Sequence, residues 1–521
     1  MDFLLVNYIL PRLDLIELFN LNQFMDFALL QQNYFKMFLP EVFLSTSIFI
    51  LCLHASLIVT SRRLSYPLVM QSFGKLSVLI LFLTFLLVNN NAILFMLTYQ
   101  NTFIFDLLSS NVKQIILIGA LFCIIISENS LIKQQINNFE YFLLVLSAVL
   151  GLLFLVSSYD MLSLYLAIEM QSLCLYVLAA AKKDSSFSTE AGLKYFILGS
   201  FSSALLLFGI SFLYGSTGTT NFDNFHLLFA GIDSETSSLT QSVEIALICI
   251  MAAFFFKIAA APFHMWSPDV YEGSPTSSTI FFAVVPKIAL FAIFLRLFQF
   301  VFASFEELFL FALVFFSIAS VISGSFVALR QKKLKRLLAY SSISHVGYLL
   351  LAFAANSLEG TQSLFFYLVI YMITSLCLWS VVLSLDTLTN EKRSKTLIDL
   401  ASVGSVNPYL GFGAMLAFFS LAGVPPLAGF FAKMEIFLSA LSSSLFFAST
   451  VAILSSVVAS YYYIRLIKTM YFEKKRENSF IFPVNRACSL TISVAVFFLL
   501  YFFVNPYLLL LLAQKMALCL F

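Results

Sequence analysis

Four ionisable residues lie deep inside long apolar stretches of this 521-residue sequence. Glu169 lies in MLSLYLAIEMQSLCLYVL, and Lys257 lies in FFFKIAAAPFHMW. Lys287 lies in FFAVVPKIALF, and Lys433 lies in LAGVPPLAGFFAKMEIF. A charged side chain at the centre of a bilayer costs about 2.5–3.5 kcal/mol, so such groups persist where they are paired, hydrated or used.

Proton transfer is the chemistry that this set of residue types could perform. Burial disfavours the charged form of a lysine, whereas a nearby carboxylate favours it. A lysine held between these two influences can take up a proton and release it again. A series of such groups bridged by water forms a proton relay. The alternative is that each lysine extends to the membrane surface or forms a static structural ion pair.

The composition of the chain indicates that lipid surrounds these residues. Hydrophobic residues make up 61% of the sequence and charged residues only 11%, against about 25% charged in soluble domains. In lipid, only helices and closed barrels satisfy the hydrogen bonds of the backbone. Because the apolar runs are long and do not alternate with polar residues, the sequence predicts an all-α polytopic membrane protein.

A hydropathy window of about 19 residues predicts about fourteen membrane-spanning helices. The stretch 91–112 is ambiguous, and 216–241 is expected to be a polar loop. The predicted spans are 40–60, 74–90, 113–128, 140–157, 159–181, 192–215, 242–262, 276–299, 304–328, 334–354, 362–386, 407–430, 443–469 and 486–513.

Several functional classes are not supported by the sequence. The net charge of +2 gives no electrostatic footprint for nucleic acid. The seven cysteines include no CxxC pair, so metal or iron–sulfur ligation is not indicated. The sequence contains neither a Walker A motif nor a GxGxxG motif after a strand-like run, which leaves nucleotide and flavin sites unsupported.

Basic residues give the expected orientation of the helices. Each of five basic clusters follows an odd-numbered predicted helix, so all five are expected on one side of the membrane. The positive-inside rule makes that side cytoplasmic, or the matrix in a mitochondrion. The clusters are Arg62 and Arg63, Lys182 and Lys183, Arg330 to Arg336, Lys392 to Lys395, and Lys474 to Arg476.

Two of the predicted helices carry both a lysine and a proline interruption. Pro262 follows Lys257, whereas Pro425 and Pro426 precede Lys433. Proline removes a backbone hydrogen bond and frees a carbonyl group. Paired broken helices in the two halves of a membrane protein point to a transport site built from inverted repeats. Ordinary proline kinks are the alternative interpretation.

The repeats define the expected domain organisation. Repeat one is predicted at about 140–299 and repeat two at about 304–469, within a single membrane domain at 37–521. Residues 1–36 form an N-terminal extension. The breaks fall in predicted helices 7 and 12, one in each repeat.

Weaker candidates surround this set. His345 in LLAYSSISHVGYLL lies near the middle of helix 10, where it is either a proton relay or a packed histidine. Lys335 and Arg336 at the start of the same helix are expected to be a solvated basic end. Lys194 is expected in the first turn of helix 6, where it either lies at the interface or reaches inward.

Three more residues lie beside the two broken helices. His264, just past the Pro262 break, is a candidate to line a cavity. Trp266 fits the aromatic belt at a membrane interface. Glu435 is two residues from Lys433 and faces another way on a helix, so it is expected to lie outside the pathway.

Five segments together resemble subunit 2 of the proton-pumping NADH:ubiquinone oxidoreductase, respiratory complex I. They are YLAIEMQSLCLYVLAA, STEAGLKYFILGSFSSALLLFG, FKIAAAPFHMWSPDVYEGSPT, KRLLAYSSISHVGY and GVPPLAGFFAKM. The resemblance runs from about residue 36 to the C-terminus, and it is closest to the plant and protist mitochondrial form. It implies a fourteen-helix antiporter-like subunit with inverted repeats and broken helices 7 and 12.

The resemblance also implies roles for the site residues. Glu169 and Lys257 would form the modulating pair of one half-channel, and Lys287 would connect them toward the centre. Lys433 would serve the exit half, and His345 would be a polar relay position between the halves.

The family further implies that this chain is a subunit of an NADH:ubiquinone reductase with no redox site of its own. NADH, FMN, iron–sulfur clusters and ubiquinone would be bound by partner subunits. The expected partners are other membrane-arm subunits of complex I, including neighbouring antiporter-like subunits, and lipids such as cardiolipin. The expected location is the mitochondrial inner membrane, with the basic loops on the matrix side.

Two other functions remain open from the sequence. The chain could be a subunit of a multi-subunit Na⁺/H⁺ antiporter, although the strings STEAGLKYFILGS and SPDVYEGSPT favour complex I. It could also be a structural scaffold whose polar residues form static pairs without transport.

Overall fold

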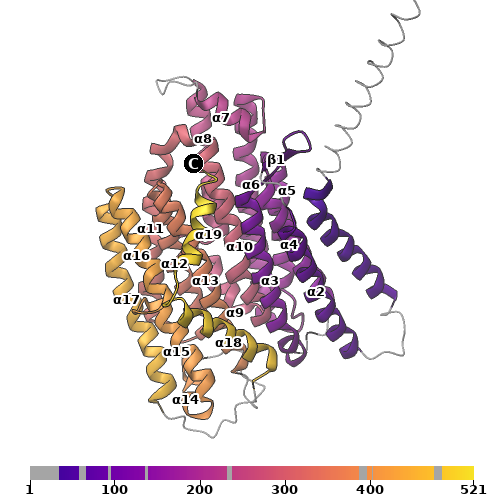
Figure 1. The fold of residues 1–521 in the computed structure, drawn as a ribbon, viewed down its shortest axis with the longest axis vertical. Helices are drawn as coiled ribbons and strands as arrows, with labels where there is room; N and C mark the ends of the chain where they lie inside the picture. Colours follow the sequence, from indigo (N-terminus) through magenta and orange to yellow (C-terminus); the bar gives the residue numbers. More distant parts are fainter. Residues whose placement is uncertain are drawn as a thin grey trace, which may run out of the picture.

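The computed structural model describes a bundle of long helices that run roughly along one common axis (Figure 1). The described residues are 35–57, 66–91, 95–134, 136, 139–230, 238–385, 396–401, 403–473 and 484–520. The predicted N-terminal extension, 1–36, lies outside them except for its last two residues.

The first half of the bundle carries Glu169, Lys257 and Lys287. Its helices are Phe35–Leu57 (the first helix), α2 Tyr66–Asn89, α3 Leu107–Lys133, α4 Glu140–Ser157, α5 Met161–Ala179, α6 Ser186–Thr217, α7 Phe222–Ala230, α8 Ser238–Ile258, α9 Trp266–Gly273 and α10 Thr276–Leu295, which continues as a wider turn over Arg296–Val301 and a 3₁₀ turn at Ala303–Phe305.

The second half carries His345 and Lys433. Its helices are α11 Glu306–Leu329, α12 Leu334–Ala354, α13 Leu358–Ser384, a 3₁₀ turn at Leu397–Leu400, α14 Val403–Val406, α15 Pro408–Ala422, α16 Ala428–Ser442, α17 Phe446–Tyr471, α18 Arg486–Tyr501 and α19 Tyr507–Ala517.

The number of passes confirms the predicted architecture. Within the described residues, 12 helices are long and apolar enough to cross a membrane. Two pairs of shorter helices, α15 with α16 and α18 with α19, are each together long enough to make one further pass. The described chain therefore contains the fourteen passes that the hydropathy pattern predicts.

The described part of the ambiguous stretch 91–112 does not form a membrane-spanning helix of its own, and its last residues, from Leu107 on, are the start of α3. It contains a β-hairpin, in which β1 Phe95–Thr98 pairs antiparallel with β2 Phe103–Asp106. The Asp106 carboxylate accepts a hydrogen bond from the Ser109 backbone N–H at 2.7 Å and so caps the start of α3. This capping pair explains why the helix begins at Leu107 rather than within the hairpin.

Three predicted boundaries were wrong. The span predicted at 486–513 is divided, because α18 ends at Tyr501 and Pro506 precedes α19. The polar loop 216–241 contains α7. Lys194 is not in a first turn, since α6 begins six residues earlier than predicted, at Ser186.

The predicted breaks in helices 7 and 12 are confirmed. Helix 7 is α8 followed by α9, and helix 12 is α15 followed by α16. The chain turns between them through residues with positive φ, Ala259 at 65° and Gly423 at 85°. The span predicted at 407–430 thus covers α15 and the break, and α16 continues it to Ser442.

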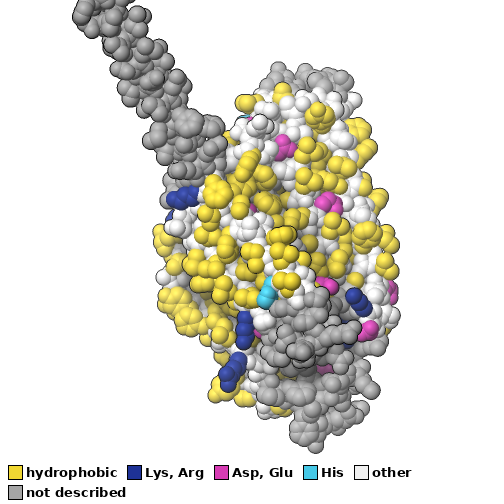
Figure 2. Space-filling model, turned by 90° about the vertical axis from the view of Figure 1, so that its right-hand side faces the viewer, with side chains coloured by type: hydrophobic (Ala, Val, Ile, Leu, Met, Phe, Trp, Pro, Cys, Tyr) yellow, Lys and Arg dark blue, Asp and Glu magenta, His cyan; other side chains and the backbone are white. Residues whose placement is uncertain are grey.

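The helices α10, α12 and α13 form the interior of the bundle. The most apolar stretch of α10 is fully buried, whereas only about a third of the corresponding stretch of α11 is buried. The side face in Figure 2 is mostly hydrophobic across its middle. The first helix and α2 carry exposed apolar side chains, such as Phe49 and Phe82. An apolar band of this kind matches a lipid or protein environment in a membrane.

The loops gather at two ends of the bundle. At one end, Lys194 of α6 and Arg336 of α12 both pair with Asp269 of α9. This contact places the predicted basic clusters beside α6 and α12 at the same end, whereas the clusters at 62–63, 392–395 and 474–476 lie outside the described residues. The hairpin and α7 lie at the opposite end, where Asn221 donates to the Asn101 carbonyl at 2.7 Å.

Candidate functional site

Glu169 lies midway along α5, on a face shared with Tyr176 two helical turns later. The Ser172 hydroxyl donates to the Glu169 carboxylate at 3.4 Å. The other carboxylate oxygen, Oε1, is buried and has no hydrogen-bond partner among the described residues. A buried carboxylate oxygen without a partner marks a place for a water molecule or a proton donor.

Lys257 lies in the last turn of α8, at the first break. Its ammonium group reaches the hydroxyl of Tyr176 at 3.4 Å and lies 5.9 Å from the centre of that ring. It makes no ion pair with the described carboxylates, so the implied Glu169–Lys257 pair is not a direct contact.

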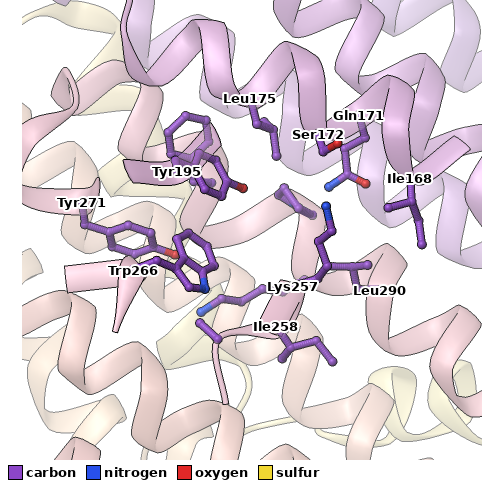
Figure 3. Close-up of a pocket in the computed structure, with 14 residues that line it drawn as sticks. Ile168, Gln171, Ser172, Leu175, Tyr195, Lys257, Ile258, Trp266, Tyr271 and Leu290 are labelled. Carbon is purple, nitrogen blue, oxygen red and sulfur yellow. The ribbon is translucent and has the colours of Figure 1, made fainter. Parts of the chain in front are cut away.

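Lys257 and Lys287 line one cavity between the helices α5, α6, α8, α9 and α10 (Figure 3). The cavity is large enough to hold water. Gln171 also lines it, and its side-chain oxygen is buried without a hydrogen-bond partner among the described residues. In Figure 3, Gln171 lies on one side of Lys257, and Trp266 lies on the other. The cavity therefore joins the two lysines by a route that water can complete.

Lys287 lies in the buried middle of α10 and is 6% exposed. Its ammonium group lies 5.4 Å from the centre of the Tyr371 ring. The preceding Pro286 lies inside the helix and has no N–H to donate. Lys287 thus faces the first-half cavity and also an aromatic residue of α13.

His345 lies in the middle of α12 and is 2% exposed. Both of its ring nitrogens have hydroxyl partners. Nδ1 lies 2.5 Å from the Tyr367 hydroxyl, and Nε2 lies 3.1 Å from the Tyr463 hydroxyl. An imidazole that is hydrogen-bonded on both sides can accept a proton at one nitrogen and release it from the other.

Lys433 lies in α16, just after the second break, and is 5% exposed. Its ammonium group donates to the carbonyls of Leu421 at 2.7 Å and Ala422 at 3.0 Å. These carbonyls belong to the end of α15, where a helix leaves carbonyl groups without intrahelical partners. A Cβ at Gly423 would come within 3.1 Å of the Lys433 side chain. The glycine therefore leaves room for Lys433 to reach the two carbonyls.

The aromatic rings connect Lys287 to Lys433. The His345 ring lies 5.4 Å from Tyr371 and 6.0 Å from Tyr348. The Lys433 ammonium group lies 5.4 Å from the centre of the Tyr348 ring. The series Lys287, Tyr371, His345, Tyr348 and Lys433 is therefore continuous through the interior of the bundle.

Most of these tyrosines were missed by the sequence analysis. Tyr367 and Tyr371 are four residues apart on α13, a spacing that places them on one helix face. That spacing was the available signal, but nothing in the sequence says that this face meets His345. The partners Tyr176 and Tyr463 carry no comparable signal, because their roles depend on contacts between distant helices.

Three expectations about neighbouring residues change. Trp266 is not an interface residue, because it is 6% exposed, lines the cavity and stacks on Tyr195 at 4.7 Å. His264 is buried but does not line the cavity. Arg336 is more than a solvated basic end, because it pairs with Asp269 at 3.0 Å and Glu272 at 3.6 Å.

Two further buried cations lie outside this series and were not identified from the sequence. Lys113 of α3 lies 2.5 Å from the Glu41 carboxylate of the first helix. Arg296 lies 2.5 Å from the Asp106 carboxylate and donates to the Val156 carbonyl at 3.1 Å. The described residues contain no cluster of three or more His, Cys, Asp or Glu side chains that could hold a metal ion.

The fold and the site together define a polytopic, antiporter-like membrane protein with lysines at its broken helices. The family model described as NADH:quinone oxidoreductase/Mrp antiporter, transmembrane, matches residues 158–459. The chain belongs to this family, among the relatives named NADH-ubiquinone oxidoreductase chain 2.

Two plant relatives with that name cover nearly the whole chain. The protein from Marchantia polymorpha is 41% identical over 92% of this chain and 98% of its own length. The protein from Oenothera berteroana is 40% identical over 94% of this chain and 99% of its own length.

Solved structures agree with the fold. A chain of respiratory complex I from Thermus thermophilus has a TM-score of 0.75 and 30% identity, over 91% of this chain and 99% of its own length. A chain of the Mrp complex from Dietzia sp. has a TM-score of 0.78 over 93% of this chain and 97% of its own length. At 18% identity, the second likeness shows the fold alone.

Proposed function

We propose that this chain moves protons across the membrane as a subunit of the NADH:ubiquinone oxidoreductase complex. Glu169, Lys257, Lys287, His345 and Lys433 are the relay residues of this proposal. The observation that carries it is that none of the three lysines has a carboxylate within ion-pair distance among the described residues. A lysine without a fixed counter-ion can lose its proton when its surroundings change.

The shared cavity supports transfer within the first half of the bundle. Two ammonium groups that face one water-accessible cavity repel each other, so protonation of Lys257 favours release from Lys287. Glu169, which reaches Lys257 through Ser172 and Tyr176, supplies the charge that biases Lys257 toward its protonated form. The first half therefore loads a proton and passes it toward the interior.

In the second half, His345 receives the proton by way of water, because the contacts of Lys287 with Tyr371 and of Lys433 with Tyr348 are ring contacts and not hydrogen bonds. His345, with hydroxyl groups on both nitrogens, is placed between Lys287 and Lys433. Lys433 rests on the helix-end carbonyls at the second break, and these stabilise its charged form without fixing it by a counter-charge. A change in the position of α15 relative to α16 would alter that stabilisation and release the proton.

The redox chemistry that drives this transfer is assigned to partner subunits, which would bind NADH, FMN, iron–sulfur clusters and ubiquinone. Neighbouring membrane-arm subunits, some of them antiporter-like, are the proposed protein partners, with cardiolipin as a candidate lipid. We place the chain in the mitochondrial inner membrane, as a multi-pass protein with its basic loops on the matrix side. Its relatives' names and its apolar helices support this placement.

The division into repeats at about 140–299 and 304–469 is part of the same proposal. One broken helix falls in each repeat, α8 with α9 and α15 with α16. The lysine precedes the break in the first repeat and follows it in the second. This placement gives each half one lysine beside broken backbone, which is the arrangement that a transport site uses.

Replacement of Lys257 by Met tests the proposal. We expect the complex to assemble, while proton pumping driven by NADH falls by about tenfold or more, because a proton-transfer group is lost. Lys468→Met is the matched control, since Lys468 is an exposed lysine of α17 that belongs to no relay contact. Normal pumping by the assembled Lys257→Met complex would contradict the relay and favour a structural scaffold without transport. Proton pumping that requires Na⁺ would favour the Na⁺/H⁺ antiporter function.

A further inference from the structure

The short helix α9 supplies one wall of the cavity that joins Lys257 to Lys287. Trp266 and Tyr271 of α9 both line that cavity. The Trp266 indole N–H donates to the Phe256 carbonyl at 2.9 Å, one residue before Lys257. Any shift of α9 therefore changes both the cavity wall and the backbone that holds Lys257.

The side of α9 away from the cavity carries two carboxylates that pair with basic residues. Asp269 lies 3.3 Å from Lys194 of α6 and 3.0 Å from Arg336 of α12. Glu272 pairs with Arg336 at 3.6 Å and also with Lys333. We call these five residues, Lys194, Asp269, Glu272, Lys333 and Arg336, the ion-pair brace.

Contacts with α6 show that the brace and the cavity wall are parts of one interface. On α6, Lys194 and Tyr195 are adjacent, and they meet two residues of the same short helix. The Tyr195 ring stacks on Trp266, with an angle of 9° between the ring planes. The neighbouring Lys194 pairs with Asp269 on the side of α9 away from the cavity. At the other end of α9, a Cβ at Gly273 would come within 2.7 Å of the Ala191 side chain, so the two helices are in close contact there.

The α12 side of the brace connects the cavity wall to the second half of the bundle. Arg336 lies in the first turn of α12, the helix that carries His345 further along. The Lys335 ammonium group also donates to the Ser274 carbonyl, just after α9, at 2.8 Å. The helix α9 is thereby held between α6 of the first half and α12 of the second half.

We propose that Asp269 is a positioning residue for proton transfer, because its carboxylate holds both α6 and α12 against α9. Through the ion-pair brace, Asp269 sets the position of Trp266 and Tyr271, and so the connection between Lys257 and Lys287. This inference rests on the proposed relay function. It goes beyond that function by assigning a coupling contact between the two halves to a residue outside the relay.

The physical strength of the brace sets the size of the expected effect. The charged side chains of Lys194, Asp269 and Arg336 are each more than a third exposed, and such pairs are individually weak and screened by salt. The brace therefore acts by biasing the position of α9 and does not hold the fold together. Loss of one shared carboxylate is expected to change proton pumping by about fivefold, the factor that one well-placed exposed ion pair supplies.

The test compares Asp269→Asn with Glu190→Gln in the assembled complex. Glu190 is the matched control, because it pairs with the same Lys194 at 2.8 Å but forms no ion pair with α9 among the described residues. We expect Asp269→Asn to lower the protons pumped per NADH oxidised about fivefold, and Glu190→Gln to pump like the unsubstituted complex. Asp269→Glu, which keeps the charge, is expected to restore most of the pumping.

The salt dependence of pumping distinguishes this positioning role from a merely structural one. Because salt screens the brace, the ratio of pumping between the unsubstituted and Asp269→Asn complexes is expected to approach one as ionic strength rises. A ratio that stays constant with salt would overturn the proposal, as would equal pumping by Asp269→Asn and Glu190→Gln. If Asp269→Asn does not assemble, Lys194→Met must reproduce the salt-dependent loss, and its failure to do so overturns the proposal.

The outcome also separates this inference from the relay itself. Normal pumping by Lys257→Met would refute the relay on which the brace acts. Loss of pumping by Lys257→Met together with normal pumping by Asp269→Asn would refute the brace and leave the relay intact.

Discussion

Two buried lysines of the same molecule, Lys113 and Lys433, have opposite surroundings. Both are 5% exposed or less. The Lys113 ammonium group lies 2.5 Å from the Glu41 carboxylate and 4.4 Å from the centre of the Phe105 ring. The Lys433 ammonium group meets only backbone carbonyls and the Tyr348 ring among the described residues.

The difference separates a structural charge from a mobile proton. The Glu41 carboxylate gives Lys113 a full counter-charge at 2.5 Å, and the pair ties the first helix to α3. Helix-end carbonyls carry only partial charges, so Lys433 has no full counter-charge among the described residues. Arg296 with Asp106 repeats the Lys113 arrangement, and a guanidinium group does not release its proton in proteins.

The largest effect on assembly is expected from breaking the structural pair. Lys113→Met leaves the Glu41 carboxylate buried without its partner, a change that costs about 3–5 kcal/mol in stability. We expect much less assembled complex, measured by native gel and by subunit content, while each assembled complex pumps normally. A loss of pumping per assembled complex would instead place Lys113 in the relay.

A second substitution serves as the control for that experiment. Replacing Glu41 and Lys113 together by Leu removes both charges, and such exchanges of a buried ion pair are often neutral or stabilising. We expect the double variant to assemble better than Lys113→Met alone. The recovery would show that the loss came from an unpaired charge and not from the lost lysine itself.

A smaller effect is expected from the histidine between the two halves. His345→Gln cannot keep both the Tyr367 and Tyr463 contacts, but ordered water can replace one of the missing links. We therefore expect pumping to fall by roughly two- to tenfold, less than for a relay lysine, with assembly unchanged. Pumping is measured as acidification of the interior of vesicles that contain the complex. Tyr367→Phe is expected to lower pumping in the same way but by less.

The sequence predicted the fold well because its signals are local. Long apolar runs give the passes, and prolines beside Lys257 and Lys433 give the broken helices, so the fourteen passes and both breaks could be anticipated. The hairpin before α3 could not, since its strands are short and apolar enough to resemble a helix. The end of α18 was missed because hydropathy does not register a break at Pro506.

The site was only half predictable for a different reason. Glu169, Lys257, Lys287 and Lys433 stand out because charge is rare in an apolar chain. The tyrosines around His345 are ordinary aromatic residues in the sequence and gain a role only where α12, α13 and α17 meet. The Glu41–Lys113 pair was missed because each of its residues lies near a predicted helix end, where a charge is unremarkable.

Proton pumping by the assembled Lys433→Arg complex is the measurement that tests the central claim most directly. Arginine keeps a positive charge near the carbonyls of Leu421 and Ala422 but does not release a proton. We predict that the complex assembles and that its pumping falls as far as in Lys433→Met. Normal pumping with arginine would contradict the account, since it would mean that the site needs only a fixed charge.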